Sequence, residues 1–600
     1  MDIFWWIIGT SVGFILWFTL IHFLPWPQTT VTPDTLGLLP WARNWFLPEP
    51  HEQWLYHLGL LIIPPTAILI WWWKRRRHQR PASLHLHPSP PWSLMEIVIV
   101  LLTLLIIFWN PNFRSTFGSL ADYGRIHQFF HYNTFVGAVS EVIYGKIPLV
   151  NTFDRYGVLI IFLPAMIFRL LPFSYVNFYL YLVVIHLIYY FLLYLLLRKL
   201  TRSRLLSWLG LVFIARLVFL RPWASHDPLS LPSTTSLRFV ADLPLFLTLF
   251  WYQLKRSRLS WFILLLINFL APLYNPEIGF SLFIATIIFL TLLTYQFRQP
   301  LIQLISRISL LVTIFLSAPA AYSLLIWVTS HQLPQWDKFV LHGRILLLGF
   351  ATLPLPKLGV YWLILAIYQF AILVTAKHLL TRSKHLLAPL IGTLAIYGLT
   401  IFHYYLGFSE TEHLLAVSIP ALILLTLWVN HLIRKYPLVT IPITLTFLWL
   451  LFHSWPRTAQ LLRSRYLPLT RGFYWSYPGT GFILSDVAQD EFVQTAQAIA
   501  ATVPPGQPVT IISRYDTLLL VMSHRASLTS YYFYDVQLLS STMIEEVVDQ
   551  IMLAQPEFIF ADPENQQSEV SQLVFQKLKN RLQWEKKAGI LDIYRWVKST

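Results

Sequence analysis

The chain is a succession of apolar runs, most of them about as long as a membrane-spanning helix. A helix that crosses the hydrocarbon core needs about 20 predominantly apolar residues, or about 17 at the short end. Runs of this kind recur from the first residues to residue 453, and they predict a polytopic α-helical membrane protein with about thirteen transmembrane helices. The predicted spans are 3–24, 55–73, 93–110, 176–197, 205–221, 239–254, 259–274, 278–296, 305–328, 358–376, 386–405, 413–432 and 436–453.

The composition supports this class. Hydrophobic residues make up 56% of the chain and charged residues 12%, whereas soluble domains carry about 25% charged residues. Many of the 25 tryptophans lie near the ends of apolar runs, which is typical of aromatic belts at membrane interfaces. The absence of cysteine excludes disulfides and thiolate metal sites. The N-terminal run has no basic region before it and no small-residue cleavage site after it, so we interpret it as a retained span rather than a signal peptide.

The basic residues predict the orientation of the chain. They cluster between apolar runs, and the positive-inside rule places such clusters in the cytoplasm. The net charge of +16 therefore reflects topology, and we expect no nucleic-acid partner. The clusters are Lys74–Arg80, Arg198–Arg204, Lys255–Arg258, Lys377–Lys384 and Arg434–Lys435.

One apolar run, 157–172, would invert every later cluster if it crossed the membrane. It is short, Pro164 interrupts it and Arg169 lies near its end, so we expect it at the interface or buried in protein. Residues 111–175 then form one long extracytoplasmic loop. We divide the chain into an N-terminal two-span hairpin with a basic cytoplasmic linker (1–92), a transmembrane core (93–455) and an extracytoplasmic α/β domain (456–600).

The last part of the chain alternates between amphipathic and short apolar segments. Helices are predicted at 489–503, 540–555 and 569–583, and strands at 508–514, 556–562 and 591–597. This alternation is typical of a small α/β domain. The segment has no glycine-rich phosphate loop and no catalytic elbow, which favours a docking or lid role.

Ionisable residues that topology does not require gather on the extracytoplasmic side. Charged groups next to a bilayer are costly unless they serve a site or face water, so these residues are the candidates for chemistry. The carboxylates Asp122, Glu141 and Asp154 in loop 111–175 are candidate catalytic bases that would deprotonate an acceptor hydroxyl or amine. Other polar residues are candidates for binding substrate, in particular a phosphate leaving group. They are Arg125, His127, His131, Arg155, Arg216, Arg238, Glu277 and His413.

The loop carboxylates also have structural interpretations. Asp122 fits an exposed loop carboxylate or a helix N-cap, and Glu141 fits a solvated helix face. Asp154 and Arg155 can pair with each other at the turn before 157–172.

The two loop histidines and Arg216, in the fifth predicted span, also have structural interpretations. His127 and His131 are four residues apart and share one face of a helix, but no third ligand at a fixed spacing completes a metal site. Arg216 lies inside a predicted span and can snorkel to the interface.

The remaining candidates open or precede predicted spans. Arg238 can pair with Asp242, four residues later. Glu277 can act as a helix N-terminal charge after Pro276, and His413 can serve as a capping or interface residue.

Three short motifs of the loop carry a resemblance to a known family. They are Ala121–Asp122–Tyr123–Gly124–Arg125, then Ile143–Tyr144–Gly145–Lys146–Ile147–Pro148, then Asp154–Arg155–Tyr156–Gly157–Val158–Leu159. Together they resemble the first extracytoplasmic loop of GT-C class glycosyltransferases, in particular the bacterial branch related to protein mannosyltransferases and aminoarabinose transferases. The family also ends in an extracytoplasmic soluble domain.

The resemblance implies a GT-C-like membrane core and a polyprenyl-phosphate-linked sugar donor, with a lipid, glycan or protein as acceptor. It gives Asp122 the role of the catalytic carboxylate and puts Arg125 at the position of a family loop arginine. It also implies a bacterial plasma (inner) membrane with the active site outside. Asp122 is followed by Tyr123, so the Asp-x-Asp pattern of a metal site is lacking; we predict no cofactor, although a divalent metal remains compatible. The alternative function is a transporter or flippase of lipid-linked saccharide, which should show broken, repeated spans.

Overall fold

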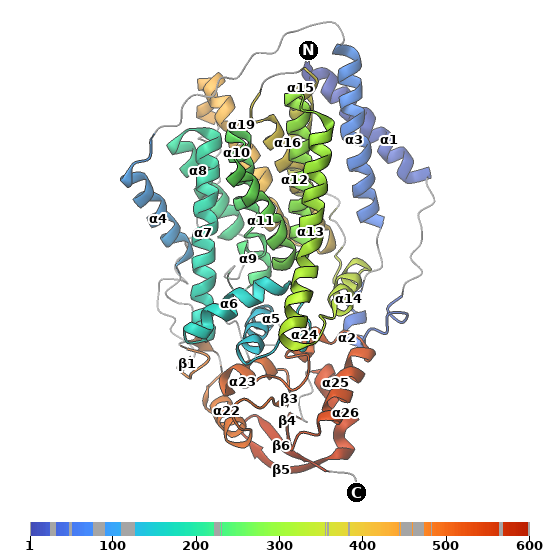
Figure 1. Cartoon of the computed structure of the whole chain (residues 1–600), viewed down its shortest axis with the longest axis vertical. Coiled ribbons are helices and arrows are strands. Elements are labelled where there is room, and N and C mark those ends of the chain that lie inside the picture. The colour runs from blue at the N-terminus through green and yellow to red at the C-terminus, as the bar shows by residue number, and fades with distance from the viewer. Residues whose placement is uncertain are drawn as a thin grey trace.

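The computed structural model of the chain is an elongated helical bundle that carries an α/β domain at one end (Figure 1). The bundle is formed by long helices that run roughly along the longest axis of the molecule. The residues that the structure describes are 2–23, 32–46, 51–75, 91–109, 126–220, 229, 231–353, 356, 359–381, 385–442, 445, 459, 473–481, 483–485, 487–562 and 568–597.

Five helical segments are long and apolar enough to cross a membrane. They are α7 (Tyr175–Thr201), α12 (Pro276–Phe297), α13 (Leu301–Ser330), α15 (Tyr361–Leu380) and the segment Ala388–Gly407, made of α16 (Ala388–Ile401) and α17 (His403–Gly407). A sixth is added if α18 (Thr411–Val417) and α19 (Ile419–Lys435), which meet at a bend of 58°, are one broken span. The structure thus agrees with a membrane protein.

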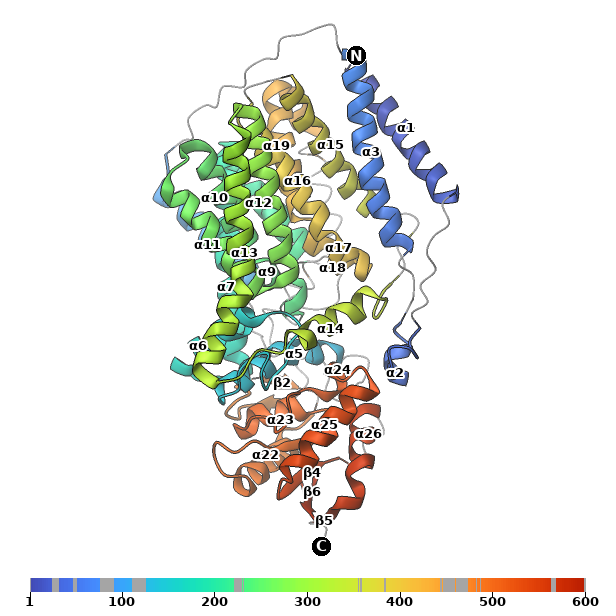
Figure 2. The same ribbon diagram turned by 45° about the vertical axis from the view of Figure 1, so that its right-hand side comes forward.

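The larger number of about thirteen spans stays a prediction, because most of the other apolar runs form shorter helices. These are α4 (Leu94–Phe108), α8 (Arg204–Ile214) with the π-helical turn η2 (Ala215–Phe219), α10 (Asp242–Lys255) and α11 (Arg258–Tyr274). The first two runs form α1 (Asp2–Phe23) and α3 (His51–Arg75), which pack against each other beside the bundle (Figure 2). The run 436–453 lies mostly outside the described residues.

The helices place basic residues at one end of the bundle. α7, α10 and α12 end at Arg202, Arg256 and Arg298, all in the left-handed conformation with φ of 55°, 46° and 51°. Cations near a helix C-terminus are stabilised by the negative end of the helix dipole. We call this end, farthest from the α/β domain in Figure 1, the basic end, and the opposite end the domain end.

Two helices lie between the bundle and the α/β domain. α5 (Ile126–Ile143) and α6 (Val158–Leu170) are oblique to the long helices (Figures 1 and 2). With 13 residues, α6 is shorter than the roughly 17 residues that a span requires. Gly157 precedes it at φ 132°, and a Cβ there would lie 2.3 Å from the carbonyl oxygen of Tyr274, so only glycine allows this approach to α11.

The α/β domain contains a four-stranded sheet of order β3-β4-β6-β5. β3 (Thr510–Ile512) is parallel to β4 (Phe558–Ala561), whereas β6 (Leu591–Trp596) is antiparallel to both β4 and β5 (Leu582–Ala588). The helices of the domain are α22 (Asp490–Thr502), α23 (Asp516–Ser523), α24 (Tyr534–Gln537), α25 (Ser541–Ala554) and α26 (Glu569–Leu578). A separate hairpin joins β1 (Phe473–Trp475) to β2 (Ile483–Ser485).

The predicted helices and strands of this domain are present, with one correction. The predicted helix 569–583 ends at Leu578, and the chain turns into strand β5 at Leu582. β5 is mostly exposed and is held by its pairing with β6 through a turn at Gly589, where φ is 61°. This pairing is a tertiary contact that outweighs the helical pattern of the segment.

The α/β domain is docked firmly on α5 and the following loop. The Tyr532 hydroxyl donates to the carbonyl of Thr134 at 2.7 Å, and its ring fills the space beside Gly137. The Gln537 side-chain amide donates to the carbonyl of Phe153 at 2.7 Å. The domain therefore forms one packed unit with the loop that carries the candidate site.

Candidate functional site

The candidate site is centred on Arg238, in the short helix α9 (Ser236–Phe239) at the domain end of the bundle. Its guanidinium is ion-paired with Glu277 and lies 4.1 Å from the ring centroid of Tyr404 and 5.6 Å from that of Tyr156. The Arg238 side chain is 11% exposed and the Glu277 side chain 38%. A partly buried cation is thus held between two aromatic rings and an accessible carboxylate.

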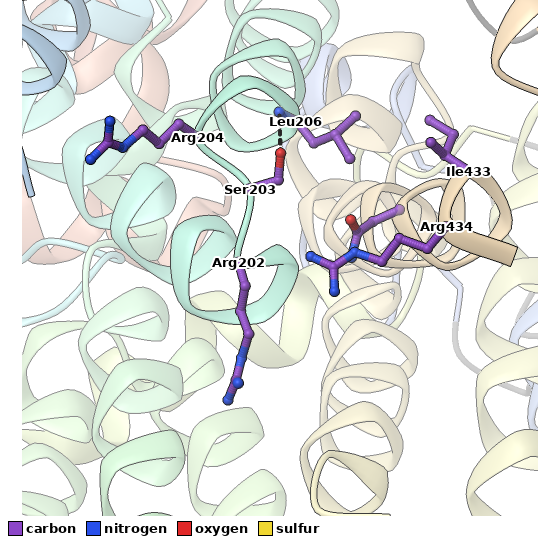
Figure 3. Close-up of a pocket in the computed structure, with 7 residues that line it drawn as sticks. Arg202, Ser203, Arg204, Leu206, Ile433 and Arg434 are labelled. Atoms are coloured by element: carbon purple, nitrogen blue, oxygen red, sulfur yellow. Dashed lines mark hydrogen bonds between the residues drawn. The ribbon is translucent and has the colours of Figure 1, made fainter. Parts of the chain in front are cut away.

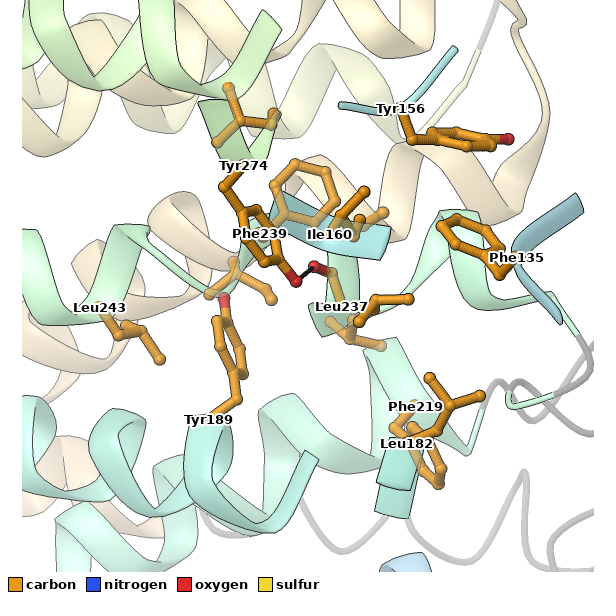
Figure 4. Packing of buried hydrophobic residues seen from close by; sticks show 14 of the residues in the cluster. Phe135, Tyr156, Ile160, Leu182, Tyr189, Phe219, Leu237, Phe239, Leu243 and Tyr274 are labelled. Atoms are coloured by element: carbon orange, nitrogen blue, oxygen red, sulfur yellow. Dashed lines mark hydrogen bonds between the residues drawn. The ribbon is translucent and has the colours of Figure 1, made fainter. Parts of the chain in front are cut away.

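The position of Arg238 is defined by the core beneath it. The Tyr274 hydroxyl, at the end of α11, donates to the carbonyl of Leu237 at 2.6 Å, as Figure 4 shows. Leu237 and Phe239, on either side of Arg238, are buried in the hydrophobic cluster drawn there. Apolar neighbours therefore anchor α9 and leave the arginine at the polar boundary of the core.

Glu277 is held by the start of α12. Asn275 caps this helix by accepting from the amide of Ile278 at 3.1 Å, and Pro276 occupies the first turn. A carboxylate in the first turn is favoured by the positive end of the helix dipole. Glu277 is therefore a helix N-terminal charge, as one of the two interpretations predicted, and it is also the partner of Arg238; its role as a site residue stays a prediction.

The loop segment 154–157 contributes the second aromatic ring. The Tyr156 amide donates to the Asp154 carboxylate at 2.8 Å, and its ring stacks on Phe135 of α5 with 4.6 Å between centroids. Arg155 lies 5.2 Å from the same ring. Asp154 and Arg155 attract each other, as considered from the sequence, and Asp154 also accepts from the Tyr532 hydroxyl at 3.4 Å. Burial raises the pKa of Asp154 to about 6, against the opposing effect of these hydrogen bonds.

His413 joins the site through Tyr404. The imidazole lies 4.5 Å from the Tyr404 ring and 4.9 Å from the Phe408 ring, measured between centroids. It belongs to α18, which follows Glu410 and has Glu412 in its first turn. Burial and the charge of Glu412 raise the pKa of Glu410. The structure thus brings together Arg155, Arg238, Glu277 and His413 from four separate parts of the chain.

Glu141 has a different place from the one predicted. Its side chain is 1% exposed, forms an ion pair with Lys146 at 2.9 Å and accepts from the amide of Ser527 at 2.8 Å. Burial raises its pKa, although Lys146 and Ser527 oppose the shift. The prediction that Glu141 lies on a solvated helix face is therefore wrong. Its closed surroundings favour a role in docking the α/β domain over a role as a catalytic base.

Arg216 also differs from the sequence interpretation. It lies in the π-helical turn η2 and is 6% exposed, so it does not snorkel to an interface. η2 packs against α18, the helix of His413. Buried charges in such bundles have protein partners or serve a site, and Arg216 remains a candidate of that kind.

The other predicted site residues are only partly visible. Asp122 and Arg125 lie outside the described residues. His127 is part of α5, but its side chain is not described, and His131 is half-buried in the same helix. Among the described residues, no group of three or more His, Asp or Glu side chains is arranged to hold a metal ion.

Asp242, which the sequence offered only as a partner of Arg238, is a buried carboxylate of the bundle. It is 2% exposed and does not pair with Arg238; instead it accepts from the hydroxyls of Tyr189 at 3.2 Å and Tyr397 at 3.4 Å. Its second carboxylate oxygen has no hydrogen-bond partner within the described part of the chain. An acidic residue at the start of an apolar run is visible in the sequence, but its two tyrosine partners come from distant helices.

No family model matches the chain, and a search among curated proteins found no match.

Proposed function

We propose that the chain is a membrane glycosyltransferase that moves a sugar from a polyprenyl-phosphate-linked donor to an acceptor at the domain end. The observation that supports this most is the Arg238 cluster, a cation and aromatic rings at the polar boundary of an apolar bundle. A lipid-linked sugar phosphate has the matching parts: an apolar chain, an anionic phosphate and a sugar with apolar ring faces. The acceptor is a lipid, glycan or protein of the cell envelope.

Arg238 is suited to bind the phosphate of the donor. Its Nε has no hydrogen-bond partner among the described residues, and a buried unused donor costs about 1–3 kcal/mol. A phosphate oxygen would satisfy it, and a charge-assisted bond in a partly buried site is stronger than one in water. Glu277 would keep the guanidinium in place, and the half-buried Tyr404 and His413 would contact the sugar or phosphate from the accessible side.

The chemical step we propose uses Asp122 as the base. Asp122 takes the proton of an acceptor hydroxyl, whose oxygen bonds to the anomeric carbon of the sugar. The bond between that carbon and the phosphate oxygen breaks, and polyprenyl phosphate leaves as an anion. Arg238 stabilises the negative charge that develops on the leaving phosphate. Residues 122–125 directly precede α5 in the sequence, and Phe135 of α5 stacks on Tyr156 of the candidate site.

The domain end would face outward from a plasma (inner) membrane. This orientation follows from the positive-inside rule, because the basic clusters gather at the opposite end. The α/β domain, docked beside the site, would then lie outside the cell membrane. Attachment of a reactive label to an engineered surface cysteine in β5, tested on intact cells, checks the orientation.

The test is a transfer assay with purified protein in lipid discs and a panel of polyprenyl-phospho-sugars. Asp122→Asn and Arg238→Gln are each compared with the exposed control Arg344→Gln in α14 (Trp336–Leu347). We expect transfer in the unmodified protein and the control, and a loss of at least about 100-fold in both site variants. Full activity of Asp122→Asn would overturn the role of this carboxylate, and no transfer with any donor would overturn the function.

Two observations support the alternative, a transporter or flippase of lipid-linked saccharide. The span formed by α18 and α19 is bent by 58°, and Asp242 is a buried carboxylate within the bundle. Broken helices and buried acidic residues are common in transporters. A flipping assay in proteoliposomes with a fluorescent lipid-linked sugar separates the two functions: movement across the bilayer that Asp242→Asn abolishes, without transfer to any acceptor, favours transport.

A further inference from the structure

At the basic end, the ends of three helices line an open pocket of about 580 Å³ (Figure 3). It lies where α7 ends, α8 begins and α19 ends. Three of its seven lining residues are arginines, and none is acidic. Its lining residues are Arg202, Ser203, Arg204, Leu206, Asn430, Ile433 and Arg434.

Two of these arginines have no carboxylate partner among the described residues. Arg204 forms an ion pair at 3.1 Å with Glu96, which it shares with Arg198, and Figure 3 shows Arg204 extending away from Arg434. Arg434 instead donates to the carbonyl of Thr201 at 2.8 Å, and Arg202 forms no ion pair in the described part of the chain. The pocket therefore has an uncompensated positive charge.

Among the described residues, Arg202 has an unused hydrogen-bond donor beside a second positive charge. Its Nε is buried and has no hydrogen-bond partner within the described segments. Burial, together with the nearby charge of Arg434, lowers its pKa. Two like charges at a partly buried site repel each other, and an anion between them would remove both the repulsion and the unused donor.

Of the three helix ends at the pocket, the start of α8 is the one that favours an anion, while the ends of α7 and α19 favour the arginines. α8 begins here, and Ser203 caps it by accepting from the amide of Leu206 at 3.3 Å (Figure 3). The N-terminus of a helix carries a partial positive charge that attracts phosphate groups. Arg434 is held by its own hydrogen bond to the carbonyl of Thr201, which also accepts from the Asn430 amide at 3.1 Å.

We propose that this pocket binds a phosphate group through Arg202 and Arg434, at the end of the bundle opposite to the candidate active site. Basic pockets between helices at the membrane surface are suited to the headgroups of anionic phospholipids. A free inorganic phosphate has the same chemistry. The proposal does not depend on the glycosyltransferase function, because it concerns the other end of the molecule.

The experiment measures binding to the full-length protein in two arms. In the first, the protein in neutral detergent is titrated with mixed micelles containing phosphatidylglycerol, with phosphatidylcholine as the neutral comparison. In the second, it is titrated with inorganic phosphate without lipid. Thermal stability reports binding in both arms, and native mass spectrometry counts the bound lipid.

The variants are Arg202→Gln, Arg434→Gln and the control Arg256→Gln. Arg256 is a matched control because it also ends a helix in the left-handed conformation at the basic end but does not line the pocket. We expect each pocket variant to weaken binding by about fivefold, which corresponds to about 1 kcal/mol per basic residue, while the control binds normally. Arg202→Lys, which keeps the charge, should restore part of the binding if Arg202→Gln does not fold.

The outcome of the two arms identifies the source of the phosphate. Saturable binding in the lipid arm alone assigns a phospholipid headgroup, and saturable binding in the second arm assigns free phosphate. Absence of saturable binding in both arms overturns the proposal. Equal weakening by Arg256→Gln also overturns it, because the attraction would then come from the general charge of this surface.

Discussion

Removing one member of the Glu141–Lys146 ion pair should loosen the α/β domain from α5. Glu141 is 1% exposed and Lys146 10%, and their atoms are 2.9 Å apart. Replacing one partner leaves a buried charge without compensation, which typically costs about 3–5 kcal/mol. In Glu141→Leu the amide of Ser527 also loses its acceptor. We therefore expect the docked state to lose about 3 kcal/mol.

The Ser527 amide cannot report this loss, because its acceptor is the replaced carboxylate. Hydrogen exchange of the Phe153 amide, which donates to the carbonyl of Ser530 in the α/β domain at 3.1 Å, measures it instead. Local opening exposes this amide, and a loss of about 3 kcal/mol corresponds to an exchange rate roughly 100-fold higher. The double variant Glu141→Leu with Lys146→Met is the control, because replacing both charges with apolar groups is often neutral or stabilising. Its exchange rate should return part of the way to that of the unmodified protein, because the Ser527 amide and the Thr529 carbonyl, to which Lys146 donates, still lose these partners. An increase of less than about fivefold in Glu141→Leu would show that water or another cation already solvates the pair, and would refute the reasoning.

Three further predictions follow from the site and its support. Arg238→Gln should lower the affinity for a lipid-linked phosphate by at least about tenfold, measured by donor competition, whereas Arg344→Gln should not change it. Burial raises the pKa of Asp154 to about 6 in the folded protein. Between pH 3.8 and about 6 the carboxyl is therefore ionised in the unfolded state but protonated in the folded state, and the free energy of unfolding declines as pH rises. Asp154→Asn should remove about 1 kcal/mol of this decline, the amount expected for a half-buried group, as measured by melting curves at a series of pH values. An unchanged slope of stability against pH would contradict the raised pKa of Asp154. Gly137→Ala should weaken domain docking by about 1–3 kcal/mol, since the added Cβ would lie 2.3 Å from the buried Tyr532 ring; unchanged hydrogen exchange along α5 would refute the packing.

The architecture places the candidate site between two rigid units. The bundle supplies Arg238 and Glu277, and the loop segment 154–157 supplies Tyr156, which α5 supports from behind. Because the α/β domain grips the same α5, movement of that domain would be transmitted to Tyr156. Side chains held by such packed elements lose less conformational entropy when a ligand binds.

Several features of the protein follow from local patterns in the sequence. The apolar runs predict helices because a long apolar segment must satisfy its own backbone hydrogen bonds in lipid. The alternation of helical and strand patterns in the last 120 or so residues predicts the α/β domain, since each pattern involves only near neighbours. The sequence also shows candidate site residues outside the apolar runs, because a charged residue next to a bilayer is costly unless it serves a site or faces water.

Which of these candidates meet was decided by the tertiary structure. Arg238 has a carboxylate four residues away at Asp242, but the fold gives it Glu277 and turns Asp242 toward tyrosines of α7 and α16. Glu141 resembles any exposed glutamate until the α/β domain covers it, almost 400 residues later in the chain. The physical reason is that a long-range contact depends on how whole helices pack, and that packing is set by the sum of many apolar contacts rather than by the charged residues themselves.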